Sequence, residues 1–115
     1  MSASVLNLES AGRRLMLPDD FLAGLLADFR DKYQTAAADI HDLLDGGQAE
    51  EAGRLAHSLK GLAGTLGAEP LQDAAARAEA AVANGNPAGI EAALAHLDEC
   101  LVLAVAEIER FLASR

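Results

Sequence analysis

Short groups of turn-forming residues divide this sequence into long uninterrupted segments, and their spacing constrains the fold more than any other feature. Glycine, proline and small polar residues gather around positions 18–20, 45–47, 67–70 and 84–87. Gly46 and Gly67 follow apolar stripes, where a residue with positive φ often ends a helix. Pro70 and Pro87 suit the first turn of the next helix, and Asn86 is a good N-cap. We therefore predict helices over about residues 19–45, 48–66, 70–84 and 87–113.

Apolar residues recur within each segment at intervals of three and four, which is typical of an amphipathic helix. Connections of two to four residues force neighbouring helices to run antiparallel. At 115 residues the chain has the size of one domain. The sequence thus predicts an all-α fold, an antiparallel up-down-up-down four-helix bundle, in a single domain over residues 1–115. A short helix over about residues 7–15 is expected to cover one end of the bundle.

The charge and cysteine content narrow the possible partners. Nine basic against 18 acidic residues give a formal net charge of −9, which argues against nucleic acid as a partner. No run of about 18 apolar residues suggests a membrane span, and no targeting pattern is visible. Cys100 is the only cysteine, so we expect it to be a buried small hydrophobic residue in a protein of the reducing cytoplasm.

One face of the second predicted helix has an unusual composition. At about 100° per residue, the apolar stripe Ala52, Leu55, Leu59, Leu62, Ala63 and Leu66 points to one side, and His57 points to the opposite side. The helical neighbours of His57 are Gly53, Lys60, Gly61 and Gly64. Each glycine within a helix costs about 1 kcal/mol of stability relative to alanine. Three glycines on one face therefore indicate that another helix or a partner protein comes close to the backbone there.

The chemistry of this face favours phosphoryl transfer over simple helix packing. A neutral imidazole is a competent phosphoryl acceptor near neutral pH, and its two nitrogens can take separate roles. Lys60, one turn away, can neutralise phosphoryl charge as a flexible cation. Gly61 leaves room for a docking surface. Tight helix packing remains an alternative explanation for Gly53 and Gly64.

Residues 56–68, with the sequence AHSLKGLAGTLGA, resemble the histidine-phosphotransfer (HPt) domain family of two-component phosphorelays. The resemblance extends from about Val5 to Leu112. Leu62 and Gly64 replace the small and polar residues that are common after the Lys-Gly pair. The Lys60-Gly61-Leu62 sequence is closer to relay-type HPt domains than to the phosphotransfer domains of chemotaxis kinases.

The resemblance implies a role for each residue of the site. His57 is then the phosphorylated residue, Lys60 stabilises the phosphoryl group, and Gly61 and Gly64 provide clearance for docking. Glu79 on the next helix is placed to accept a hydrogen bond from Nδ1–H of His57, which leaves Nε2 as the nucleophile. The alternative for Glu79 is an ordinary solvated charge.

The resemblance also implies the partners. We expect a monomeric carrier that takes phosphoryl from a receiver-domain aspartate and passes it reversibly to another receiver, with a hybrid sensor histidine kinase as a possible upstream protein. Mg²⁺ is expected in the receiver and no cofactor in this chain. No nucleotide-binding loop is visible, so we expect no autokinase activity. His41 and His96 lie near acidic residues, but we predict no metal site. The alternative function is a non-catalytic helical interaction or dimerisation module.

Overall fold

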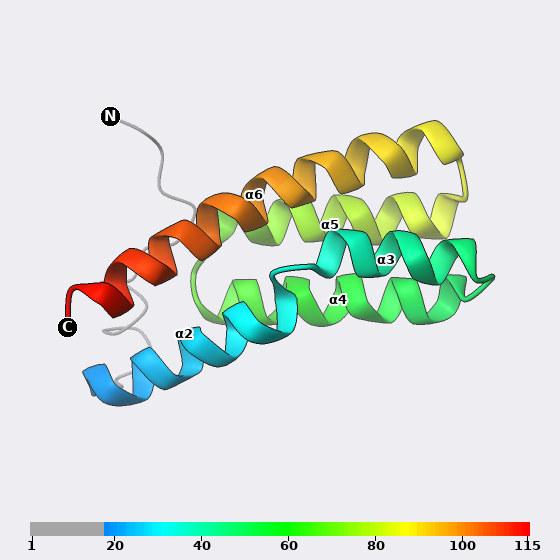
Figure 1. Ribbon diagram of the computed structural model, residues 1–115. Coiled ribbons are helices and arrows are strands. Elements are labelled where there is room, and N and C mark those ends of the chain that lie inside the picture. Colours follow the sequence, from blue (N-terminus) through cyan, green and yellow to red (C-terminus); the bar gives the residue numbers. More distant parts are fainter. Residues whose placement is uncertain (1–17) are drawn as a thin grey trace.

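The structure, a computed structural model, describes residues 18–115, which form α-helices and no strands. The helices are α2 (Asp19–Tyr33), α3 (Ala36–Asp45), α4 (Ala49–Thr65), α5 (Glu69–Asn84) and α6 (Pro87–Ala113). From α3 to α6, each helix runs antiparallel to the one before it (Figure 1). The predicted all-α antiparallel bundle is confirmed. The helix predicted over residues 7–15 lies outside the described residues.

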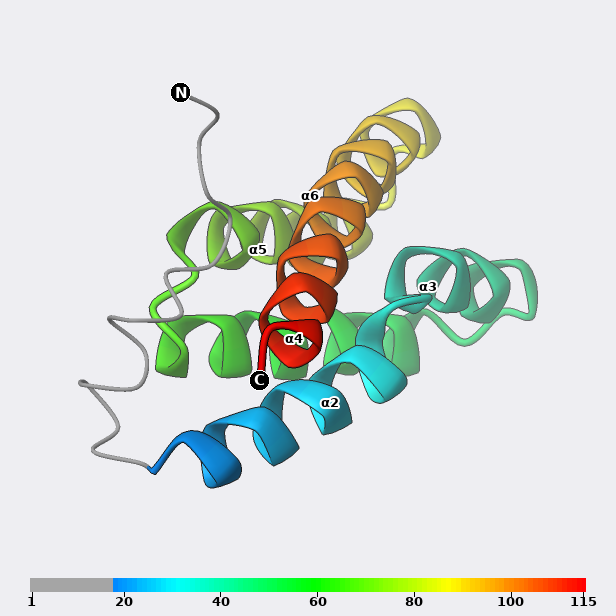
Figure 2. The ribbon, with the colours of Figure 1, turned by 60° about the vertical axis from the view of Figure 1, so that its left-hand side comes forward.

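The prediction of one helix over residues 19–45 is wrong, because α2 ends at Tyr33 and α3 begins at Ala36. Between them Thr35 leaves the helical region, with φ −107° and ψ 19°. Figure 2 shows the chain changing direction at this point. Helix α2 packs along α6, whereas α3 packs against both α4 and α6. A straight helix could not follow both directions, so the break allows the whole segment to bury its apolar side.

Glycine with positive φ follows the C-terminal ends of α3 and α4. Gly47 has φ 75° and Gly67 has φ 72°. After each glycine, the next backbone N–H bonds a carbonyl five residues back, at 2.8 and 2.9 Å, which is the Schellman arrangement. The positive φ therefore belongs to Gly47 and not to Gly46, whose φ is −83°. Asn86 caps α6 as predicted, since its Oδ1 accepts the N–H of residues 88 and 89.

The core is built from small and medium-sized apolar side chains, in keeping with close-packed helices. Its largest fully buried members are Leu26, Phe29, Ile40, Leu59, Leu66, Leu71, Leu97, Leu101 and Ile108. Among the residues of the range 18–115 whose side chains are described, which leaves out position 19, no polar or charged residue is buried. Cys100 is buried, as predicted. In this part of the chain, no helix is long and apolar enough to span a membrane.

Candidate phosphotransfer site

Helix α4 has one buried face and one exposed face. Ala52, Ala56, Leu59 and Ala63 are buried along the inner face. His57 lies on the outer face, with its side chain 67% exposed. The predicted orientation of His57, away from the core, therefore agrees with the structure. Helix α4 packs against α3 and α5, and His57 lies midway along it, so the imidazole is presented from the middle of a packed helix.

The imidazole of His57 is hydrogen-bonded to a carboxylate on α5. Its Nδ1 lies 2.8 Å from Oε2 of Glu79. A carboxylate only accepts hydrogen bonds, so the contact favours the tautomer that carries its hydrogen on Nδ1. The lone pair of that tautomer is on Nε2, and the ring is mostly exposed. The arrangement thus leaves Nε2 with the nucleophilic lone pair.

The same carboxylate also binds Lys60. Nζ of Lys60 donates to Oε1 of Glu79 at 2.7 Å, and both side chains are about one-third exposed. The hydrogen bond from Lys60 lowers the pKa of Glu79 below its ordinary value of 4.5, partial burial opposes this, and the hydrogen bond with His57 lowers the pKa further. Glu79 is therefore ionised at neutral pH and bridges the two residues.

The three glycines near His57 have different surroundings. A Cβ added to Gly61 would meet no atom within 4 Å, so this position is open. At Gly53 the nearest atom would be Cγ1 of Val82, at 4.0 Å, an ordinary van der Waals contact. At Gly64 an added Cβ would lie 2.6 Å from Nε2 of Gln72. Gly61 therefore has the expected open space, whereas the Gln72 side chain from α5 fills the space beside Gly64.

The sequence did not single out Gln72, which is exposed on α5. Gln72 precedes Glu79 by seven residues, and Gly64 follows His57 by seven residues. In an antiparallel helix pair, the register that joins His57 to Glu79 also joins Gly64 to Gln72. This symmetry was the available signal for Gln72, and it depends on knowing the His57–Glu79 pair first.

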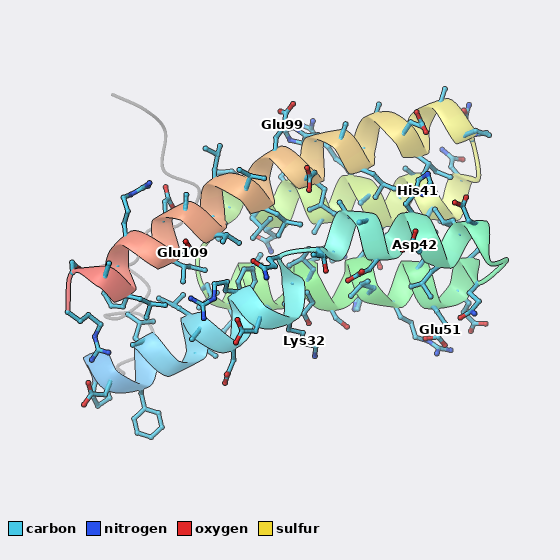
Figure 3. The ribbon with its side chains drawn as sticks, in the orientation of Figure 1. Lys32, His41, Asp42, Glu51, Glu99 and Glu109 are labelled. Atoms are coloured by element: carbon cyan, nitrogen blue, oxygen red, sulfur yellow. The ribbon has the colours of Figure 1, made fainter. Side chains whose placement is uncertain are left out.

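His41, Asp42 and Asp45 form the group of possible metal-ligating atoms in the described part of the chain, where these atoms lie within 4.8 Å of one another. His41 Nδ1 is 3.3 Å from Asp45 Oδ2. All three side chains are exposed on one turn of α3, and Figure 3 shows those of His41 and Asp42 on that helix. His96 lies apart from this group, with Nε2 4.0 Å from Sγ of Cys100.

Comparison with protein families matches residues 24–110 to the Hpt domain. This range covers most of the chain and includes every residue of the predicted site. No curated protein and no solved structure matches the chain. The helical bundle, with an exposed histidine on a central helix, agrees with the family match. The chain therefore belongs to the histidine-phosphotransfer (Hpt) domain family, whose members carry phosphoryl groups in phosphorelays and interact with receiver domains.

Proposed function

We propose that His57 accepts a phosphoryl group from the aspartyl phosphate of one receiver domain and passes it to the aspartate of another. The observation that carries this proposal is the 2.8 Å contact between Nδ1 of His57 and Glu79, on a ring that is 67% exposed. It combines a defined tautomer with an accessible Nε2. A helical packing module has no need of either property.

This geometry supports the following transfer step. The Nε2 lone pair attacks phosphorus as the P–O bond to the receiver aspartate breaks, and the aspartate leaves as a carboxylate. The new N–P bond places positive charge on the imidazole, whose Nδ1–H faces the carboxylate of Glu79. A second receiver reverses the step, since its aspartate attacks phosphorus and His57 leaves as neutral imidazole. Glu79 thus orients the ring and offsets its charge in the phosphorylated state.

Lys60 and Gly61 support the same step in different ways. In the unphosphorylated site, Nζ of Lys60 donates a hydrogen bond to Glu79. After phosphorylation of His57, the flexible Lys60 side chain can turn to bind the phosphoryl oxygens. Gly61 leaves the surface open on the turn that follows His57. Gly64 provides clearance for a partner only if the Gln72 side chain moves aside, which is inexpensive for the end of a flexible exposed side chain.

The proposal assigns the remaining chemistry to the partners. The receiver supplies the Mg²⁺ that neutralises phosphoryl charge, and this chain acts as a monomeric carrier in the cytoplasm, without autokinase activity. The donor receiver is either free-standing or part of a hybrid sensor histidine kinase. The single buried cysteine, Cys100, agrees with a reducing compartment.

The test uses a panel of purified receiver domains, labelled on aspartate with radioactive acetyl phosphate and mixed briefly with the wild-type chain. We expect label on the wild type and none on His57→Gln. The matched control is His41→Gln, which removes another exposed histidine and should be labelled normally. Because His57 is exposed, circular dichroism and melting of His57→Gln should stay close to wild type.

The label should be labile in acid and stable in base, as a phosphoramidate is. Acid-stable label would indicate Ser or Thr instead. Label that persists in His57→Gln would refute the site. If the wild type binds receivers and is labelled by none of them, the alternative of a non-catalytic interaction module replaces the proposal.

A further inference from the structure

Arg54 is an exposed cation on α4 that the proposed chemistry does not use. It precedes His57 by three residues, or one helical turn. Its side chain is 63% exposed, compared with 33% for Lys60, the other basic residue of α4. Lys60 is also bound to Glu79. Arg54 is therefore the more accessible positive charge beside His57 on this helix.

Arg54 lies on the open side of His57. At about 100° per residue, Arg54 and Gly61 lie about 60° and 40° to one side of His57, and Lys60 lies about 60° to the other side. The Lys60 side faces α5 and is occupied by Glu79. Gly61 has no atom within 4 Å of its Cβ position. Gly61 lies one turn after His57 and Arg54 one turn before it. A partner that covers both turns on this side of Nε2 therefore meets Arg54.

Two acidic residues of the preceding turn hold the guanidinium in place. Nη1 of Arg54 donates to Glu51 at 2.6 Å and Nη2 donates to Glu50 at 3.0 Å. Glu51 projects outward from α4 in Figure 3. The guanidinium has five N–H donors, so those that these contacts do not use can bind a further carboxylate. Exposed ion pairs such as those of Arg54 with Glu50 and Glu51 are weak, so Arg54 can give up one of them for a carboxylate of a partner at little cost in free energy.

We infer that Arg54 is a docking residue that pairs with a carboxylate on the receiver at the rim of its phosphorylation site. The inference rests on the proposed function, in which the partner is a receiver domain. The phosphorylation site of a receiver holds both the acceptor aspartate and Mg²⁺, so it must gather several carboxylates. Glu50 and Glu51 orient Arg54 and at the same time weaken its attraction for an acidic partner. Removing their charges should therefore strengthen docking, and removing the charge of Arg54 should weaken it.

The test compares Arg54→Gln with Arg77→Gln. Arg77 is the matched control, since its side chain is 64% exposed and paired with Asp73 one turn away on α5. Binding of a fluorescently labelled receiver domain, the panel member that binds the wild type best, is measured by anisotropy at low and high NaCl. We expect Arg54→Gln to raise Kd by about fivefold at low salt, with a smaller difference at high salt. Arg77→Gln should bind as the wild type does.

A double variant, Glu50→Gln/Glu51→Gln, should bind more tightly than the wild type. Equal Kd values for Arg54→Gln and Arg77→Gln would overturn the inference. So would a shorter lifetime of isolated phosphorylated His57 in Arg54→Gln with unchanged receiver binding, because Arg54 would then contact the phosphoryl group instead. Binding is measured without transfer, so a receiver that binds but never labels the wild type refutes the proposed function and still tests Arg54.

Discussion

Glu79→Gln tests how far one carboxylate controls the reactivity of His57. The side chain keeps its size but loses the charge that binds His57 Nδ1 at 2.8 Å and Lys60 Nζ at 2.7 Å. Its amide can donate a hydrogen bond to Nδ1, which favours the tautomer with the hydrogen on Nε2 and removes the nucleophilic lone pair from that atom. A charge-assisted hydrogen bond at a partly exposed site contributes about 1.5 kcal/mol, so transfer should slow about tenfold.

The assay is rapid-quench measurement of transfer from one phosphorylated receiver, with nitrogen NMR shifts of the His57 ring recorded on the same samples. The shifts report the tautomer directly, so they separate an effect on ring orientation from an effect on docking. In Glu79→Gln the fraction of the Nδ1–H tautomer should fall together with the rate. A variant that transfers at the wild-type rate with an unchanged tautomer would refute the role of Glu79.

The difference in stability between the wild type and Glu79→Gln should depend on pH, with a sign that the shifted pKa of Glu79 sets. In the folded protein the hydrogen bond from Lys60 lowers the pKa of Glu79 from the ordinary value of 4.5, against the effect of partial burial, and the hydrogen bond with His57 lowers it further. The carboxylate therefore contributes stability that is fully present above pH 4.5 and is lost as the pH falls through its lower folded value. At neutral pH the variant should melt a few degrees below the wild type. A difference that stays the same in acid would contradict this account.

Three further substitutions test the surroundings of the site. Lys60→Ala should slow transfer severalfold or shorten the lifetime of phosphorylated His57, with little change in melting. A transfer rate and a lifetime that both equal those of the wild type would remove Lys60 from the mechanism. Gly61→Gln should block receiver binding and preserve helix content. Gly61→Ala should bind normally, because the added methyl group meets open space. Normal binding of Gly61→Gln would refute close approach of the receiver to α4 at this position. Gly64→Ala should raise stability by up to about 1 kcal/mol in a thermal melt, since alanine favours the helix and Gln72 can move aside. A lower melting temperature would show that Gln72 is held firmly.

Most of the fold could be predicted because its helix boundaries depend on local chemistry. Asn86 and Pro87 begin α6 at the predicted position. The break between α2 and α3 could not be predicted in this way. No glycine or proline marks Gln34 and Thr35, and the apolar stripe continues across them from Tyr33 to Ala36, both buried. The break follows from packing against α6 and α4, which is a tertiary effect that the periodicity of one segment does not contain.

The features of the candidate site likewise fall into those that one helix specifies and those that depend on packing between helices. The exposure of His57 and the open space at Gly61 follow from positions on one helix, so helical periodicity was enough to predict them. Glu79 required the resemblance to a family, because its contact depends on the register between α4 and α5. Gln72 and the sharing of Glu79 by Lys60 escaped prediction for this reason. Both are cross-helix contacts, and a single helix does not specify them.

The shared carboxylate suggests how a carrier can hold a phosphoryl group without trapping it. In the unphosphorylated site the charge of Glu79 is offset by Lys60, at 2.7 Å, while His57 is neutral in the proposed tautomer. On the proposed mechanism, phosphorylation puts positive charge on the ring and negative charge on the phosphoryl group, so Glu79 can pair with the ring as Lys60 turns to the phosphoryl oxygens. Each state then pairs its opposite charges without a new buried ion. Lys60 offsets one of the roughly two negative charges of the phosphoryl group, and the rest is carried on an exposed ring, where water can solvate it. Glu79 is thus paired in both states, which limits the energy difference between them and favours transfer in both directions.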